Sequence, residues 1–175
     1  MHLSLDGLEK KGYAYTESSF IESAKKGDIE AARLFLAEGI DINTKNERGQ
    51  TAPMRAAEYQ RTEVVTLLLE KGADVNIGNN RNNRTALMEA SSAGNIVIIE
   101  QLAERGAEIN AKDITNNTPL HFACMWGHVE AVSLLIELGA KPDMRGEQDM
   151  TPMMPAEQNG HAEVVEVLKS AGVKE

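Results

Sequence analysis

Apolar residues are spaced along this chain in a way that predicts short helices at a nearly constant interval. In one stretch, Val64, Val65, Leu67 and Leu68 fall on one face of a helix. A weaker copy of the same pattern begins 33 residues before the first of four clear copies, at Ser18. The clear copies are 34, 33 and 33 residues apart and begin at Thr51, Thr85, Thr118 and Thr151. A fixed period of this length predicts a chain built from five similar units.

Each unit carries start and stop signals for two helices. The leading Thr is predicted to cap the first helix by accepting hydrogen bonds from its first turn. Pro119 and Pro152 follow at the first helical position, where a missing N–H costs nothing. Glycines are predicted to end the helices, namely Gly27, Gly94, Gly127 and Gly160 for the first helix and Gly39, Gly72, Gly106, Gly139 and Gly172 for the second.

Some residues in the turns are expected to adopt a left-handed backbone. Two residues before each leading Thr stand Gly49, Asn83, Asn116 and Asp149, whose types tolerate positive φ better than most. Gln60 stands where other copies carry the glycine that ends the first helix. We expect that replacement to cost between a few tenths and about 1 kcal/mol of stability.

The shared pattern T-P-L-H…A-A…G-H…E-V-V…L-L-L…G-A-D-V-N resembles the ankyrin repeat. The resemblance covers about residues 17–175, as repeats at 17–45, 46–79, 80–112, 113–145 and 146–175, with the first divergent and the last a C-terminal cap. It implies an all-α solenoid of stacked antiparallel helix pairs with projecting turn or hairpin loops. Residues 1–16 are expected to form a short capping helix over the first repeat, or else to be the tail of a longer upstream region.

Composition favours an aliphatic core. Aromatic residues make up only 4% of the chain, against 42% for all hydrophobic residues. We therefore expect a core of Leu, Val, Ile, Ala and Met, in which Met54, Met88, Met153 and Met154 point inward from the first helices.

Charge and targeting signals narrow the classes of partner and compartment. Asp and Glu outnumber Lys and Arg by 27 to 18, a net charge of −9, which argues against nonspecific binding to nucleic acid or anionic membranes. No apolar run has membrane-spanning length, and no signal peptide is visible. We expect a cytoplasmic monomer, or a periplasmic or secreted one if a signal was removed. Residues 14–43 resemble bacterial ankyrin proteins.

The spacing of His121, Cys124 and His128 suggests a metal or thiolate site, because residues three and seven apart share a helix face. The aligned residues argue against it, since they are Met54, Met88 and Met154 for His121, and Ala57, Ser91 and Glu157 for Cys124. Gly127 also breaks the helix before His128. We expect no metal, cofactor or catalytic site, an inert buried thiol, and no enzyme activity.

The resemblance implies a concave groove formed by the loop tips and the exposed side of the first helices, which we predict to be the partner-binding surface. Tyr59 and Trp126 occupy equivalent positions two repeats apart, and Ala93 between them is expected to leave a hollow. Trp, Tyr and Arg are frequent binding hot spots. The candidate residues are Arg48, Tyr59, Arg81, Arg84, Met125, Trp126, Arg145 and Met150, with the two tip arginines Arg81 and Arg84 beside the hollow.

These features favour a non-enzymatic module that binds a partner protein, which is what the resemblance also implies. The alternative is an accessory or targeting region of a larger enzyme or secreted effector.

Overall fold

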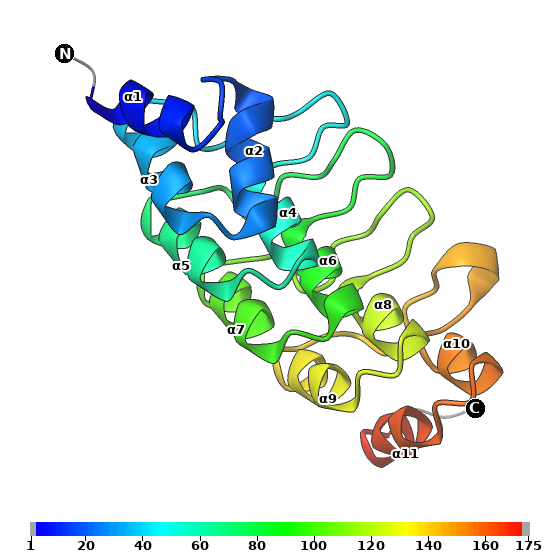
Figure 1. The fold of residues 1–175 in the computed structure, drawn as a ribbon. Helices are drawn as coiled ribbons and strands as arrows, with labels where there is room; N and C mark the ends of the chain where they lie inside the picture. The colour runs from blue at the N-terminus through cyan, green and yellow to red at the C-terminus, as the bar shows by residue number, and fades with distance from the viewer. Residues whose placement is uncertain (1–2, 173–175) are drawn as a thin grey trace.

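The computed structural model describes residues 3–172 as a curved stack of helices (Figure 1). Residues 1–2 and 173–175, at the outer ends of the expected cap and last repeat, lie outside the described residues. The helices are α1 (Leu3–Lys10), α2 (Glu17–Lys26), α3 (Ile29–Ala37), α4 (Ala52–Glu58), α5 (Thr62–Glu70), α6 (Ala86–Ala93), α7 (Ile96–Glu104), α8 (Pro119–Met125), α9 (Val129–Glu137), the 3₁₀ helix η1 (Glu147–Asp149), α10 (Met153–Gln158) and α11 (Ala162–Ser170).

The helices form two rows, as Figure 1 shows. The first helix of each repeat (α2, α4, α6, α8 and α10) stands in one row, and the second (α3, α5, α7, α9 and α11) stands in the other. Long loops project from the side of the first row. Each helix packs on its partner within the repeat and on its counterpart in the next repeat. The expected all-α solenoid is confirmed.

The core runs the length of the stack and is mostly aliphatic. Leu68, Ile99 and Leu135 from the second helices are each fully buried, as are Met88 and most of the alanines of the first helices. The prediction for Met154 is wrong, because this side chain is 39% exposed. The equivalent residue in the preceding repeat, His121, is buried and contacts the Met150 carbonyl in the loop that follows. In the described chain no later repeat covers Met154 in this way.

Most of the predicted helix caps and left-handed residues are found at the expected positions. Thr51, Thr85 and Thr118 are the N-caps of α4, α6 and α8, whereas α10 begins one residue later than expected, at Met153. The predicted left-handed positions are confirmed, with φ of 73° at Gly49, 57° at Asn83, 63° at Asn116 and 63° at Asp149. Gln60 also adopts positive φ, at 57°.

Asparagine side chains join successive repeats through main-chain atoms. Asn43 Oδ1 accepts from the Asp74 N–H at 2.9 Å. Asn76 accepts from the Glu108 N–H and donates to the Gly106 carbonyl. Asn110 does the same with the N–H of Lys141 and the carbonyl of Gly139. These bonds join successive repeats in addition to the packing of their helices.

The N-terminal helix α1 packs against α3. Leu8 is buried in this contact, with 1% of its surface exposed. Lys11 follows α1 and its Nζ lies 3.2 Å from Asp28 and 2.9 Å from Glu30. The structure thus places a helix against the first repeat. Among the described residues, no helix has the length and apolar character needed to cross a membrane.

Candidate interaction groove

Trp126 is a large apolar side chain that the fold leaves in solvent. It caps the C-terminus of α8 and is 58% exposed. The backbone beside it is held by the next repeat, because the Met125 carbonyl accepts from His161 Nε2 and from Asn159 Nδ2, each at 3.1 Å. Gly127 follows with φ of 73° and turns the chain into α9. Trp126 is therefore presented from a rigid turn.

Tyr59 holds the equivalent place at the end of α4 and is 39% exposed. Two cations flank its ring, with Lys25 Nζ 5.3 Å and the Arg55 guanidinium 4.8 Å from the ring centroid. Arg55 also pairs with Glu58. The electron-rich face of the ring favours this arrangement. Tyr59 is thus an exposed ring in contact with two cations.

The loop tips carry Arg48 and Arg81 as predicted, both exposed. Each tip is shaped by an asparagine, since Asn46 Oδ1 accepts from the Arg48 N–H and Asn79 Oδ1 from the Arg81 N–H, both at 3.0 Å. Such turns fix the backbone before any partner arrives. The arginine side chains therefore extend from ordered loops.

The prediction that Arg84 lies at a tip is wrong. Its guanidinium lies 4.1 Å from the centroid of the Phe122 ring, and its Nη2 is 3.2 Å from Glu89 Oε2. Only 20% of the side chain is exposed. Burial raises the pKa of Glu89, and the charge of Arg84 opposes that rise. Arg84 directly precedes the N-cap Thr85, and its side chain lies against Phe122 of the next repeat rather than pointing outward.

The remaining predicted residues lie near the last loop. Arg145 is exposed and donates to the Asp149 carbonyl at 2.8 Å. Met150 is half-buried, and its carbonyl accepts from His121. Met125 is half-buried beside Trp126, and Ala93 is half-buried at the end of α6. The hollow beside Ala93 stays a prediction.

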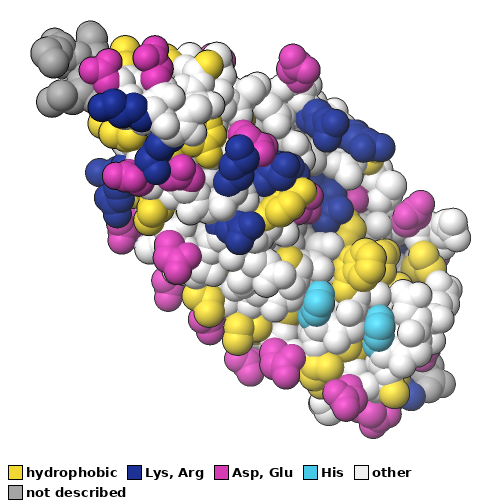
Figure 2. Space-filling view, in the orientation of Figure 1, with side chains coloured by type: hydrophobic (Ala, Val, Ile, Leu, Met, Phe, Trp, Pro, Cys, Tyr) yellow, Lys and Arg dark blue, Asp and Glu magenta, His cyan; other side chains and the backbone are white. Residues whose placement is uncertain are grey.

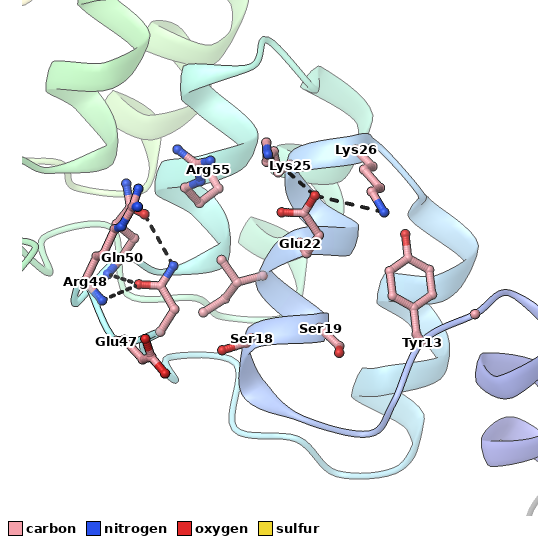
Figure 3. Close-up of a pocket in the computed structure, with 13 residues that line it drawn as sticks. Tyr13, Ser18, Ser19, Glu22, Lys25, Lys26, Glu47, Arg48, Gln50 and Arg55 are labelled. Atoms are coloured by element: carbon pink, nitrogen blue, oxygen red, sulfur yellow. Dashed lines mark hydrogen bonds and ion pairs between the residues drawn. The ribbon is translucent and has the colours of Figure 1, made fainter.

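A basic pocket at the N-terminal end of the groove was not predicted. It is a cavity of about 580 Å³ between α2, α4 and the loop that precedes α4 (Figure 3). Lys25, Lys26, Arg48 and Arg55 line it. Figure 2 shows Lys and Arg side chains gathered over α2, α4 and the neighbouring loops, while Asp and Glu side chains follow the edge formed by the second helices.

Alignment of the first repeat with the others would have placed two of the pocket's lysines in the groove. Lys25 and Lys26 lie 33 residues before Glu58 and Tyr59, so they occupy the same two positions in the first repeat. The prediction applied the register only from the second repeat onward. The total charge of −9 also concealed the uneven distribution of charge along the chain. Residues 1–84 hold twelve Lys and Arg against thirteen Asp and Glu, whereas residues 85–175 hold six Lys and Arg against fourteen Asp and Glu.

The side chains that suggested a metal site are instead buried or hydrogen-bonded to backbone groups. Cys124 is fully buried, and burial raises the pKa of its thiol to about 12. His121 Nδ1 accepts from the Thr118 N–H at 3.1 Å, so Nε2 donates to the Met150 carbonyl, also at 3.1 Å. His128 Nε2 reaches the Ser92 carbonyl of the preceding repeat instead. Within residues 3–172 there is no group of three His, Cys, Asp or Glu placed to hold a metal ion.

Comparison with known proteins agrees with the observed architecture. The family model described as ankyrin repeats (3 copies) matches residues 20–113 and 112–174. A comparison with curated proteins finds no match. The family match extends over nearly the whole stack of helix pairs, and the chain therefore belongs to the ankyrin-repeat family.

Proposed function

We propose that the protein is a non-enzymatic module that binds a partner protein along its groove. Ankyrin repeats are generally protein-interaction modules. The observation that carries the proposal for this chain is the exposure of Trp126 and Tyr59 at equivalent helix ends, 58% and 39% respectively. The core does not need either side chain at these exposures.

The geometry suits binding because little has to be ordered on association. Trp126 projects from a turn that His161 and Asn159 hold in place. Lys25 and Arg55 flank Tyr59. Aromatic side chains on ordered backbone lose little conformational freedom when a partner covers them. Both residues are thus suited to act as anchors.

The chemistry of the described residues also favours binding over catalysis. The thiol of Cys124 is buried and has a pKa raised to about 12, so almost none of it is thiolate at neutral pH. His121 is buried, and both of its ring nitrogens are engaged in hydrogen bonds. Neither group is available to a substrate in solution.

The test compares three immobilised proteins in capture from the native source, followed by calorimetric titration of the captured partner. They are the wild type, Tyr59→Ala/Trp126→Ala, and Ile96→Ala/Val97→Ala. The last removes two apolar residues of similar exposure, 40% and 44%, from α7 in the other row. We expect the groove variant to bind at least about tenfold more weakly and the control to match the wild type. Equal affinity of all three proteins would refute the proposal, as would failure of the wild type to retain any partner.

A further inference from the structure

The groove changes chemical character along one column of positions. At the two equivalent residues that end each first helix, the repeats carry Lys25 and Lys26, Glu58 and Tyr59, Ser92 and Ala93, Met125 and Trp126, and Gln158 and Asn159 in turn. The column therefore begins with two cations at α2, passes an aromatic ring at α4 and a small residue at α6, and reaches the exposed indole at α8. A partner that follows the groove meets positive charge at one end and apolar surface toward the other.

Positive charge exceeds negative charge in the pocket at the α2 end. Its lining contains four cations, Lys25, Lys26, Arg48 and Arg55, against two carboxylates, Glu22 and Glu47. Arg55 also pairs with Glu58 outside the lining, which leaves an excess of one positive charge in a chain of net charge −9. The pocket thus has a local sign opposite to that of the whole molecule.

Part of this positive charge has no carboxylate of its own among the described residues. Lys25 and Lys26 share the single carboxylate of Glu22, at 3.5 Å and 4.0 Å. Arg48 forms no ion pair with any residue of the described range, and it is exposed at its loop tip. Figure 3 shows Lys25 and Lys26 extending from α2 and Arg48 from the loop that precedes α4. Lys25, Lys26 and Arg48 thus have one ion-paired carboxylate among them, and an anionic ligand can supply the others.

Rings beside the pocket contact two of these cations, Lys25 and Lys26. Lys26 Nζ lies 5.3 Å from the centroid of Tyr13, and Lys25 Nζ lies at the same distance from that of Tyr59. A lysine positioned by a ring loses less freedom when it pairs with a carboxylate. Tyr59 therefore lies beside the pocket at the position equivalent to Trp126, and a ligand that leaves the pocket along this column meets its ring first.

We propose that the partner contributes an acidic peptide segment, whose Asp or Glu side chains enter the pocket at Lys25, Lys26 and Arg48 and whose apolar side chain covers Trp126. This inference rests on the proposed function and adds the chemistry of the partner. A short peptide fits the observed charge better than nucleic acid does, because the chain has a net charge of −9 and this cluster of cations lies at one end of the column, whereas nucleic acid carries negative charge along its whole length. Charge complementarity of this kind sets specificity and association rate.

The test uses fluorescence anisotropy at low ionic strength with two labelled peptides. One alternates Glu and Gly and ends in Leu, and the other has Gln in place of every Glu. We expect the Glu peptide to bind, the Gln peptide to bind at least about tenfold more weakly, and added salt to weaken the Glu peptide. Absence of binding by the Glu peptide, or equal binding of both peptides, would overturn the inference.

Matched variants distinguish binding at the pocket from an effect of the protein's total charge. Lys25→Gln/Lys26→Gln/Arg48→Gln and the control Arg33→Gln/Lys71→Gln/Lys141→Gln lower the net charge equally, and the control residues are exposed and do not line the pocket. Exposed ion pairs contribute little each, so we expect the pocket variant to lose about tenfold in affinity and the control almost none. An equal loss in both variants contradicts a local site. Tighter binding of a single-stranded oligonucleotide than of the Glu peptide contradicts the acidic peptide.

Titration of the captured partner separates the proposal of an acidic segment from the proposal that the protein is an interaction module. If the partner loses affinity for Tyr59→Ala/Trp126→Ala but not for the pocket variant, the interaction module stands and the acidic segment is refuted. If neither variant loses affinity for the partner, both proposals fail.

Discussion

Replacement of His121 tests how one side chain joins two repeats. Its Nδ1 accepts from the Thr118 N–H that begins α8, and its Nε2 donates to the Met150 carbonyl in the next repeat. The side chain is 1% exposed, so water cannot replace either bond. The chain supplies its own matched variant, because Met54 occupies this position in the second repeat and its sulfur lies 3.4 Å from the Thr51 nitrogen.

The expected losses follow from counting the bonds. His121→Met keeps a weak acceptor for the Thr118 N–H and strands only the Met150 carbonyl, so we expect the free energy of unfolding to fall by about 1–2 kcal/mol. His121→Ala strands both backbone groups and leaves a void, for an expected fall of about 2–4 kcal/mol. His128→Asn is the control, with an expected cost of about 1 kcal/mol or less, because this half-buried site carries Asn in the third repeat.

Urea unfolding measures these differences through the single Trp and through far-UV circular dichroism. The two signals must give one transition, since repeat arrays can lose two-state behaviour. Equal destabilisation by Met and Ala would refute the importance of the capping acceptor. A loss below about 0.5 kcal/mol for both would refute the bond between repeats.

The same variants predict a pH dependence. Burial lowers the pKa of His121 below the usual 6.5, although the hydrogen bond to the Met150 carbonyl opposes this shift. The unfolded chain therefore takes up this proton at a higher pH than the folded chain does. Stability from neutral His121 is complete above pH 6.5 and is lost as the pH falls below it, so the advantage of the wild type over His121→Met should shrink there. A constant difference on both sides of pH 6.5 would contradict a neutral buried imidazole.

Three further predictions concern single positions. Gln60→Gly should raise stability by about 1 kcal/mol, because Gln60 holds φ of 57°, and a lower melting temperature would contradict this reasoning. Gly127→Ala should cost about 2 kcal/mol or more, because φ is 73° and the new Cβ would lie 2.5 Å from His161 Nδ1. Gly139→Ala, with φ of 92° and nothing within 4 Å, should lose only about 1 kcal/mol and serves as its control in thermal unfolding. The Cys124 thiol, with its pKa raised to about 12, should resist thiol reagents at neutral pH until urea unfolds the chain, and rapid labelling of the native protein would disprove its burial.

The repeating part of the fold could be predicted because its signals are local. The N-cap at Thr85 and the left-handed backbone at Asn83 and Asn116 depend on a few neighbouring residues. Their recurrence at one period strengthened each assignment. The exposure of Tyr59 and Trp126 followed from the same register, since equivalent positions in a stack face the same surface.

What could not be predicted depends on pairs far apart in sequence. Arg84 turns inward because Phe122 in the following repeat offers its ring, a contact that the loop sequence does not reveal. The basic pocket joins Lys25 and Lys26 to Arg48, which approach only when two repeats stack. Met154 is exposed because no later repeat covers it in the described chain. Each miss is a property of an interface between units rather than of one unit.

The asparagine bonds between repeats bear on how such a chain diversifies. Asn43, Asn76 and Asn110 bind N–H and carbonyl groups, which every neighbouring residue supplies regardless of its side chain. A repeat can therefore be duplicated or exchanged without a matching change in the repeat it joins. These contacts between repeats therefore do not depend on which side chains line the groove. That independence leaves evolution free to place Lys26, Tyr59 or Trp126 at one recurring position, so that recognition can change while the stack stays together.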